Sequence, residues 1–412
     1  MEDLKVLIIG HTWPEPKATA AGGRMMQLIQ FFLTHGYSIS FGSTANNIDK
    51  GADLDQLGVQ SIKLLLNDQS FDTYLQQLKP DIVVFDRFIT EEQFGWRVTE
   101  FAPNAIKILD TEDLHSLRLA RKQALEKQTV FTNKLWRQHQ HTIREVAAIY
   151  RCDLSLIISE YEMQLLTKEL GIPASQLLYL PYMLDPLEVE ETKDWLPFEE
   201  REHFVFIGTG KHPPNVDAIK WLKMEIWPLI KEALPATQLH IYGAYLPQAV
   251  KQFNHQTEGF IVKGWAEDAN MSMSRAKVNL APLRYGAGIK GKLVLAMRQG
   301  TPNVATKVGA EGISGYFQNQ GCANDDAMEF AKQAIDLYTN KRQWSAIQLK
   351  GLNAINQQFN KSVHYTSLNK AIVHLQTNLS QHRIQNFTGA MLMHHTMAAS
   401  MYLAKWITAK NT

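Results

Sequence analysis

Short, almost continuous apolar runs recur along this chain, separated by segments with the spacing of amphipathic helices. The first run, residues 4–9, contains one lysine and ends at Gly10. Such runs are typical of strands buried on both faces of a parallel sheet, because helices cover both sides of these sheets. Further runs follow at residues 37–41, 81–85, 105–109, 154–158 and 177–181, and residues 25–34 have helical spacing. The alternation predicts a doubly wound α/β sheet.

A polar, acid-rich stretch, residues 185–202, interrupts this pattern, after which the pattern begins again. The second series of apolar runs lies at residues 203–208, 238–243, 259–264 and 277–283, with Asn215 expected to cap a helix after the first of them. We therefore predict two Rossmann-like domains, residues 1–195 and 196–379, and a C-terminal helical extension, residues 380–412. Ligands of such domains bind at the carboxyl ends of the strands, so a cleft between the two domains is the expected site.

Length and composition support two domains and exclude several function classes. The chain has 412 residues, more than one core usually supports. Its 42 basic side chains nearly balance its 41 acidic ones, so no global charge attracts nucleic acid. Cys152 and Cys322 lie far apart, which is evidence against a disulfide framework or a zinc site. With no signal-peptide pattern and no bilayer-spanning run, we expect a cytoplasmic protein.

Residues 380–412 are rich in methionine and moderately apolar. The favoured interpretation is a helix that packs back on the body. The alternative is an interfacial helix, which would give the protein peripheral contact with the inner face of a membrane. His394, His395 and Lys405 interrupt the apolar residues and disfavour a membrane span.

Residues 284–306, RYGAGIKGKLVLAMRQGTPNVAT, place a glycine- and lysine-rich turn between a strand and a predicted helix over 289–299. Unpaired amides at the start of a helix favour an anion, and Gly286 and Gly288 would let that anion approach the backbone. Arg284 and Lys290 add positive charge, so a phosphate-bearing ligand is the simplest reason for this combination. This interpretation requires that the turn faces the first domain and is not filled by the protein's own side chains. The alternative is a tight strand-to-helix turn with solvated lysines.

The segment GAGIKG also matches the dinucleotide fingerprint GxGxxG. That fingerprint belongs after the first strand of its domain, whereas several strands precede it here. A nicotinamide or flavin site is therefore disfavoured, and no cofactor is expected.

Six segments, in order, resemble the retaining glycosyltransferases of glycosyltransferase family 4, and the resemblance extends from about residue 5 to residue 375. They are PEPKATAAGGRMMQLIQFF, ILDTEDLHSLRLAR, CDLSLIISEYE, FIGTGKHPPNVDAIKWL, PLRYGAGIKGKLVLAM and ATKVGAEGI. The resemblance implies the GT-B fold and a metal-independent transfer of a sugar from a nucleotide-diphosphate donor to a carbohydrate or lipid-linked hydroxyl. Polysaccharide or glycolipid synthesis is the expected setting.

The resemblance also implies roles for individual residues. The donor diphosphate would lie on Gly22, Gly23, Arg284, Gly286, Gly288, Ile289 and Lys290. His115 would contact the sugar and, with Asp110, form the catalytic pair, while Arg118 and Lys211 are possible additional contacts. Simpler interpretations stay open: Gly22 and Gly23 can shape the start of a helix, and Asp110 or Thr111 can cap another.

Two positions depart from the family pattern. Many members carry paired glutamates where this chain has Ala287 and Leu295, and leucine cannot accept a hydrogen bond from the donor ribose. Glu311 is the nearest candidate by sequence to replace that contact. The departure leaves two alternatives to the transferase: a non-catalytic relative that acts as a partner subunit, and a nucleotide-sugar epimerase on the same scaffold.

Overall fold

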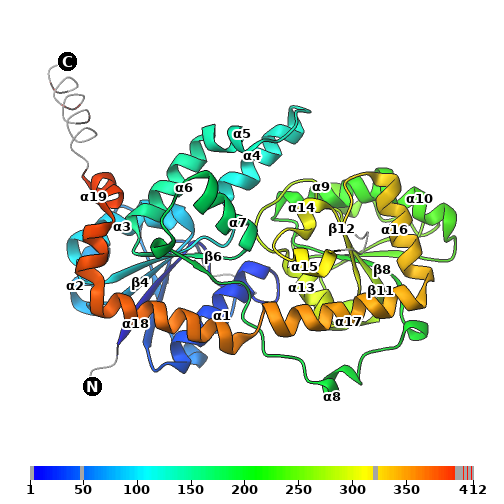
Figure 1. Ribbon diagram of the computed structural model, residues 1–412, viewed down its shortest axis with the longest axis horizontal. Coiled ribbons are helices and arrows are strands. Elements are labelled where there is room, and N and C mark those ends of the chain that lie inside the picture. The colour runs from blue at the N-terminus through cyan, green and yellow to red at the C-terminus, as the bar shows by residue number, and fades with distance from the viewer. Residues whose placement is uncertain are drawn as a thin grey trace.

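The computed structural model describes residues 4–46, 51–318 and 323–394, together with residues 402, 406 and 410. Two β-sheets lie side by side, each flanked by helices (Figure 1). All pairings between the named strands are parallel. The predicted α/β class, with two doubly wound sheets, is therefore confirmed.

Within the described ranges, the first sheet has seven strands in the order β3-β2-β1-β4-β5-β6-β7. They are β1 (Lys5–Gly10), β2 (Ser38–Ser43), β3 (Gln60–Lys63), β4 (Ile82–Asp86), β5 (Ile106–Asp110), β6 (Leu154–Ile157) and β7 (Leu177–Tyr179). All except β3 match predicted apolar runs. Strand β3 was not predicted, because this edge strand is mostly exposed and lacks an apolar run.

The helices between these strands are α1 (Ala20–Thr34), α2 (Ser70–Leu78), α3 (Arg87–Phe101), α4 (His115–Glu126), α5 (Asn133–Gln138), α6 (Gln140–Arg151) and α7 (Glu160–Gln164). Helix α1 begins before the predicted residue 25. Thr19 caps it by accepting a hydrogen bond from the amide of Gly22. Gly22 and Gly23, both predicted to contact the donor diphosphate, thus lie in the first turn of a helix.

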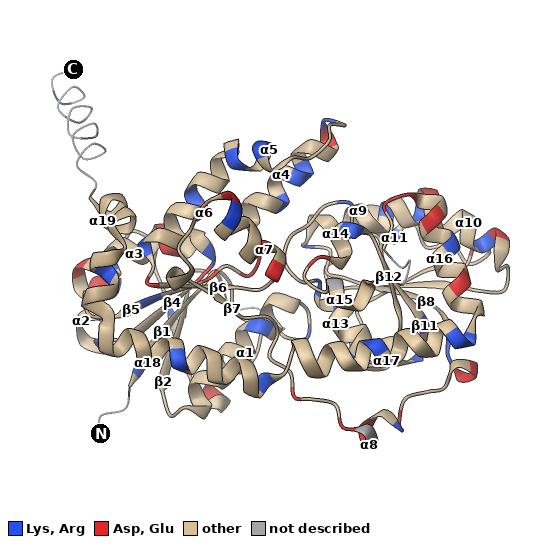
Figure 2. Ribbon diagram, viewed as in Figure 1, with Lys and Arg blue, Asp and Glu red and all other residues tan. Residues whose placement is uncertain are grey.

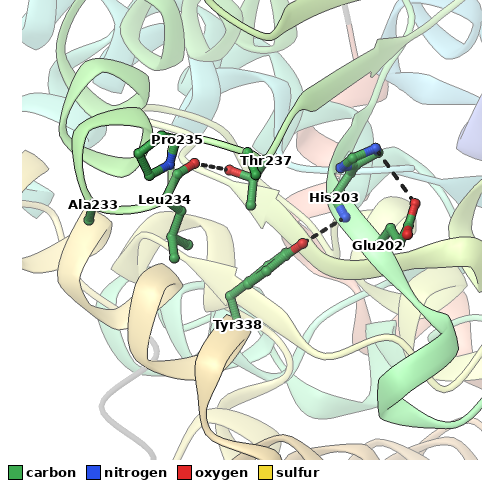
Figure 3. A pocket seen from close by; sticks show the side chains of 8 residues that line it. Glu202, His203, Ala233, Leu234, Pro235, Thr237 and Tyr338 are labelled. Atoms are coloured by element: carbon green, nitrogen blue, oxygen red, sulfur yellow. Dashed lines mark hydrogen bonds and ion pairs between the residues drawn. The ribbon is translucent and has the colours of Figure 1, made fainter.

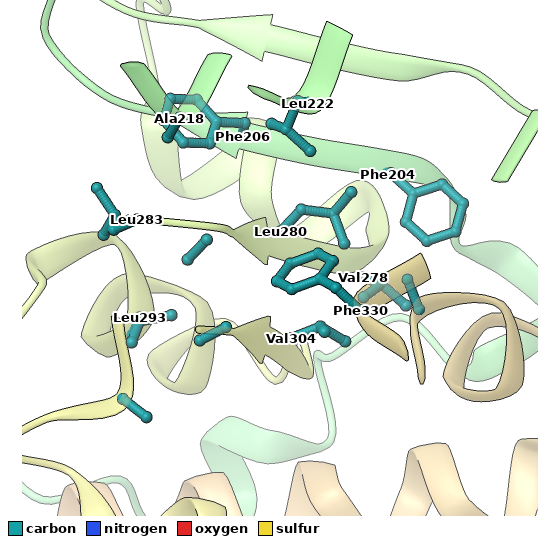
Figure 4. Packing of buried hydrophobic residues seen from close by; sticks show 14 of the residues in the cluster. Phe204, Phe206, Ala218, Leu222, Val278, Leu280, Leu283, Leu293, Val304 and Phe330 are labelled. Atoms are coloured by element: carbon teal, nitrogen blue, oxygen red, sulfur yellow. The ribbon is translucent and has the colours of Figure 1, made fainter. Parts of the chain in front are cut away.

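The second sheet has five strands in the described part of the chain, in the order β10-β9-β8-β11-β12. They are β8 (Glu202–Ile207), β9 (Leu239–Tyr242), β10 (Phe260–Gly264), β11 (Ala276–Ala281) and β12 (Asn303–Ala305). Figure 4 shows its core, where Phe204, Val278, Leu280 and Phe330 pack together and are fully buried. This core is separate from the two apolar clusters on the faces of the first sheet.

The helices of the second half are α8 (Val189–Thr192), α9 (Pro213–Trp221), α10 (Trp227–Ala233), α11 (Gln248–Lys251), α12 (Ala269–Arg275), α13 (Gly291–Arg298), α14 (Lys307–Ala310), α15 (Ser314–Phe317), α16 (Ala327–Thr339), α17 (Lys341–Gln358), α18 (Lys361–Gln385) and α19 (Phe387–Met393). Short 3-10 turns lie at η1 (Asp55–Leu57), η3 (Ala174–Gln176) and η4 (Phe198–Glu200), and π-helical turns at η2 (Leu165–Glu169) and η5 (Leu222–Ile226).

The prediction that Asn215 caps a helix is wrong. Helix α9 begins at Pro213, where the fixed φ of proline suits the first helical position, and its N-cap is His212. Asn215 is inside the helix, and its side-chain amide donates to the carbonyl of Thr209 at 3.0 Å.

Helix α18 follows the second domain in sequence but packs against the first (Figure 1). Leu368, Ile372 and Leu375 are buried in the apolar cluster that also contains Val6 and Ile8 of β1. The chain therefore crosses between the domains twice, through residues 185–202 and through α18. The predicted domain limits remain predictions.

The first part of the C-terminal extension, residues 380–393, packs back on the body. Helix α19 contacts α6, and Asn386 donates a hydrogen bond to the carbonyl of Tyr150 at 2.7 Å. Residues 395–401, 403–405, 407–409, 411 and 412 lie outside the described part of the chain, as does Cys322, while Cys152 is buried. No helix among the described residues is long and apolar enough to cross a membrane.

Candidate active site

The glycine-lysine turn after β11 faces the first domain, as predicted. Gly288 has φ +65°, and a Cβ added to it would lie 2.9 Å from the Cβ of Asp113. A Cβ added to Gly291 would lie 2.6 Å from the Cβ of Ala20, at the start of α1. Contacts this close leave no room for side chains, so both glycines allow the two domains to meet.

The second requirement, an unfilled turn, is not met at Gly288. The Glu162 carboxylate lies on it: its Oε1 accepts hydrogen bonds from the amide of Gly288 at 2.8 Å and from the amide of Leu114 at 2.9 Å. Among the described residues, the amides of Ile289 and Lys290 donate no hydrogen bond. The turn therefore already holds one anionic group, which belongs to the protein itself.

Sequence reasoning missed Glu162 because its local pattern suggests a different role. Ser159 and Glu162 have the S-x-x-E spacing of a capping box, in which the glutamate turns back to its own helix. Ser159 does cap α7, accepting from the Glu162 amide at 3.2 Å. The Glu162 side chain instead extends to the neighbouring domain, and its buried Oε2 has no hydrogen-bond partner within the described part of the chain. Burial raises the pKa of Glu162 to about 7.

Helix α4 carries the predicted sugar-contacting histidine, and distant acids cap its start. Glu145 of α6 accepts hydrogen bonds from the amides of His115 and Ser116, at 2.9 and 3.1 Å. The alternative interpretation, that Asp110 or Thr111 caps this helix, does not hold, because the N-cap is Leu114 and has no side-chain cap. The orphan amides at a helix start attract any buried carboxylate within reach.

His115 lies at the carboxyl edge of the first sheet, close to Asp113 and Arg118. Its Nε2 is 3.1 Å from Oδ1 of Asp113, and Arg118 Nε donates to the other oxygen of that carboxylate at 2.8 Å. Burial lowers the pKa of His115 to about 3, so the imidazole is neutral near pH 7. If Nε2 carries the proton of the neutral ring, its N–H group donates a hydrogen bond to Asp113. Nδ1 would then be left as an acceptor for a ligand hydroxyl.

Asp110 is fully buried and is not exposed where the two domains meet. Its carboxylate forms an ion pair with Arg24 at 2.8 Å, and both side chains are fully buried. Arg24 also donates to the carbonyl of Leu180 at 2.7 Å. The predicted catalytic role of Asp110 is therefore corrected to a structural one: the pair joins α1, β5 and the segment after β7 beneath the site.

The two glycines of α1 have different surroundings. A Cβ added to Gly22 would lie 2.5 to 2.6 Å from backbone atoms of Glu15, so this glycine is required by packing against the preceding loop. A Cβ added to Gly23 would meet nothing within 4 Å. Of the two, Gly23 is the one that borders open space and could approach a ligand.

Cationic side chains surround the turn after β11. Lys290 is 8% exposed, its Nζ donates to the carbonyl of Gly288 at 2.8 Å, and burial lowers its pKa to about 8. Lys292 donates to the side-chain oxygen of Asn215 at 2.7 Å, and burial lowers its pKa to about 7. Arg284 pairs with Asp217 of its own domain, with Nε 2.9 Å from Oδ2. Ile289, the remaining predicted contact of the turn, is a buried core residue.

Glu311 and Lys211 both form ion pairs with the first domain. Glu311, predicted to contact ribose or sugar, pairs with Arg121 of α4 at 2.6 Å. Arg121 also donates to the carbonyl of Gly286 at 2.8 Å, so one side chain holds two segments of the second domain. Lys211 is half exposed and lies 3.7 Å from a carboxylate oxygen of Glu15.

The positions that depart from the family pattern contribute to packing. Ala287 packs against an apolar cluster of the first domain, and Leu295 packs beside Val205, Met273 and Ala276. The apolar face of α13 thus contributes to the apolar core of the second domain.

The carboxyl edge of the first sheet also contains two residues with strained backbone. Arg87 follows β4 with φ 73°, and Glu112 follows the neighbouring β5 with φ 62°. Residues with side chains rarely adopt this region unless the surrounding structure enforces it. Sequence reasoning gave neither residue a role, because nothing in a single sequence indicates a positive φ at a residue other than glycine.

Two hollows lie elsewhere, at the amino edge of the second sheet. One of about 420 Å³ is lined by Glu202, His203, Leu234, Thr237 and Tyr338 (Figure 3), and one of about 580 Å³ adjoins it. Ligands of parallel sheets bind at the carboxyl edge, so we place the candidate site at the turn after β11. The described residues contain no group of three or more side chains suited to a metal ion.

Comparisons with known proteins show which proteins the chain is similar to. Residues 201–340 match the family model described as "Glycosyl transferases group 1", so the second domain is similar to glycosyltransferases of that group. An uncharacterized 44.6 kDa protein in the cps region of Klebsiella pneumoniae is 21% identical over 225 residues. That match covers 53% of this chain and 55% of the relative, so it spans about half the length of each.

Solved structures confirm the GT-B fold over most of the chain. Sucrose-phosphate synthase from Thermosynechococcus elongatus has a TM-score of 0.67 at 16% identity, covering 90% of this chain and 99% of that one. Anabaena HepE in complex with UDP-glucose has a TM-score of 0.65 at 14% identity, covering 90% and 100%. A glycosyltransferase from Rickettsia africae has a TM-score of 0.64 at 11% identity, covering 92% and 100%.

Proposed function

We propose that this chain is a retaining, metal-independent glycosyltransferase that binds a nucleotide-diphosphate sugar at the turn after β11. One observation carries the proposal: a carboxylate already lies on the Gly288 amide, at a turn that also holds Lys290 and faces the first domain. An amide that binds a carboxylate oxygen can bind a phosphate oxygen by the same hydrogen bond. The family match of the second domain gives independent support.

The proposed chemistry is electrostatic. Lys290 uses one hydrogen bond on the Gly288 carbonyl, so its ammonium group keeps two for the phosphates. Positive charge held there stabilises the negative charge that develops on the departing diphosphate. Neutral His115 would accept a hydrogen bond from a hydroxyl of the transferred sugar, which fixes the sugar without adding charge next to Asp113.

The acceptor would lie on the first domain, where Arg118 and the strained Arg87 and Glu112 line the carboxyl edge. The cps-region relative favours an acceptor in polysaccharide synthesis, and HepE in complex with UDP-glucose favours a UDP-sugar donor. A cytoplasmic location with peripheral membrane contact would suit a lipid-linked acceptor.

A second candidate is a non-catalytic partner subunit. The closed turn and the apolar residues Ala287 and Leu295 favour it, because the usual ribose contact is absent and Glu311 is engaged with Arg121. The epimerase alternative shares the donor site and differs only in its product.

Purified protein incubated with a panel of labelled nucleotide sugars separates these candidates. We expect donor turnover, with Lys290→Ala lowering the rate about 100-fold because it removes charge stabilisation in the transition state. Lys307→Ala is the matched control, since Lys307 is an exposed lysine near the next strand end. Turnover that is equal in wild type and Lys290→Ala would exclude the proposed site. A product that is an altered nucleotide sugar would indicate epimerisation, and the absence of turnover with every donor would favour the partner subunit.

A further inference from the structure

We propose that Glu162 is an internal anion that closes the donor site, and that the donor diphosphate must displace it from the Gly288 amide to bind. The inference rests on the proposed function and adds a mechanism that regulates the same site. Glu162 belongs to α7 of the first domain and Gly288 to the second, so this contact occupies the site and joins the domains at once.

The carboxylate of Glu162 is only half satisfied where it lies. Oε1 accepts both amide hydrogen bonds, whereas buried Oε2 accepts none from any residue that the structure describes. A buried carboxylate normally gains several hydrogen bonds to offset lost hydration. Holding Glu162 here is therefore weakly favourable, as expected of an occupant that a better ligand replaces.

A diphosphate would be that better ligand. It carries more negative charge and more acceptor oxygens than one carboxylate, and the Ile289 and Lys290 amides beside Gly288 have no partner among the described residues. It could not simply be added, because Glu162 and nearby Asp113 would repel it. Displacement of Glu162 removes the nearer negative charge and frees the amide in one step.

Other contacts between the domains would remain after Glu162 is displaced. Arg121 joins α4 to Glu311 and to the Gly286 carbonyl, and the Tyr245 hydroxyl donates to Glu15 at 2.7 Å. These bonds keep the domains together around the turn without using the Gly288 amide. The domains can therefore stay associated while Glu162 exchanges with a phosphate, and Glu162 sets how readily the site opens.

Titration calorimetry of the full chain with UDP tests the inference. Glu162→Ala removes the competing anion, so we expect UDP to bind about tenfold more tightly than to wild type. Glu162→Gln keeps an oxygen that can accept both amides but removes the charge, so its affinity should lie between the two. Glu160→Gln is the matched control, because Glu160 is an exposed acid on the same helix, and it should leave the affinity unchanged.

The outcomes separate this inference from the proposed function. If wild type binds UDP and Glu162→Ala binds it equally or less tightly, the internal-anion inference is overturned while the donor site survives. If only the Glu162 variants bind UDP, the inference is supported in its strongest form. If neither wild type nor variants bind UDP, GDP, ADP or dTDP, both ideas fail. Should Glu162→Ala not fold by circular dichroism, the comparison between Glu162→Gln and Glu160→Gln decides in its place.

Discussion

The carboxyl edges of the two sheets meet, and they carry different kinds of residues. The first edge is acidic, with Asp110 at the end of β5, Glu112 and Asp113 directly after it and Glu162 nearby; Figure 2 shows acidic residues next to β6 and α7. The second edge has glycines followed by Lys290 and Lys292. An anionic ligand therefore suits the second edge better than the first, and there the carboxylate of Glu162 accepts a hydrogen bond from the Gly288 amide.

Burial also differs between the edges. The acid Asp110 is neutralised by Arg24 within its own domain, so that pair stabilises the first domain whatever the second one does. Lys290 is buried and Lys292 is partly exposed, and neither forms an ion pair within 4.0 Å among the described residues. The difference teaches that Asp110 at the first edge is held in a structural pair, whereas Lys290 and Lys292 at the second edge stay without an ion-pair partner among the described residues, at a cost in stability.

The largest expected effect comes from breaking the pair beneath the first edge. Arg24→Met leaves the Asp110 carboxylate buried without a partner, which costs about 3–5 kcal/mol in the free energy of unfolding. Urea denaturation followed by circular dichroism measures it. Arg144→Met is the control, because Arg144 pairs with Glu92 at the surface and should change stability by less than about 1 kcal/mol. Similar losses of stability in Arg24→Met and Arg144→Met would show that the buried pair contributes no more than the surface pair.

A smaller effect is expected where the two edges are joined. Arg121→Met removes the bonds to Glu311 and to the Gly286 carbonyl, and should cost about 2–3 kcal/mol. Thermal unfolding measures the change, and a double-mutant cycle with Glu311→Gln should show strong non-additivity. Lys122→Met, in an exposed pair with Glu126, is the control. Additive effects of Arg121→Met and Glu311→Gln would mean that the pair does not couple the domains.

The smallest effect is a pH dependence at the second edge. Burial lowers the pKa of Lys292 from 10.5 to about 7 in the folded state, so this lysine binds its proton less readily when folded than when unfolded. Its contribution to stability is therefore complete above pH 10.5 and declines as the pH falls toward 7.

Lys292→Met should remove that decline. The variant should gain stability relative to wild type as the pH falls from about 10 to about 7, by about 1–2 kcal/mol, and the gain should level off below about pH 7. Melting temperatures across this range measure it, with Lys307→Met as the exposed control. A difference independent of pH would show that Lys292 keeps its ordinary pKa.

Much of the fold could be predicted because burial on both sides of a sheet gives each central strand an apolar run. Strands β1, β4, β5 and β8 were found in this way, and the polar segment 185–202 located the crossing between domains. Edge strand β3 was missed because one of its sides faces solvent. The crossing of α18 back to the first domain was also missed, because an amphipathic helix does not specify which core it covers.

The candidate site was predicted less completely. The turn at Gly286 and Gly288 was found because glycines and lysines gathered between a strand and a helix favour an anion at that point. The alternative that Asp110 or Thr111 caps α4 considered only nearby residues, whereas the amides at its start bind Glu145 and Glu162 from distant parts of the chain. Glu162 itself matches a capping box with Ser159. In the folded chain Ser159 caps the helix, but the Glu162 side chain binds amides elsewhere.

By itself, the sequence determined the class of fold, the order of the strands' apolar runs and the presence of a cationic, glycine-rich turn, because these depend on local spacing and residue type. Only the tertiary structure decided which groups meet at that turn. Hydrogen bonds such as Glu162 to Gly288 and Arg121 to Glu311 join residues more than 100 positions apart. Burial at these contacts also sets their pKa values, because the dielectric environment of a side chain is a property of its neighbours in space.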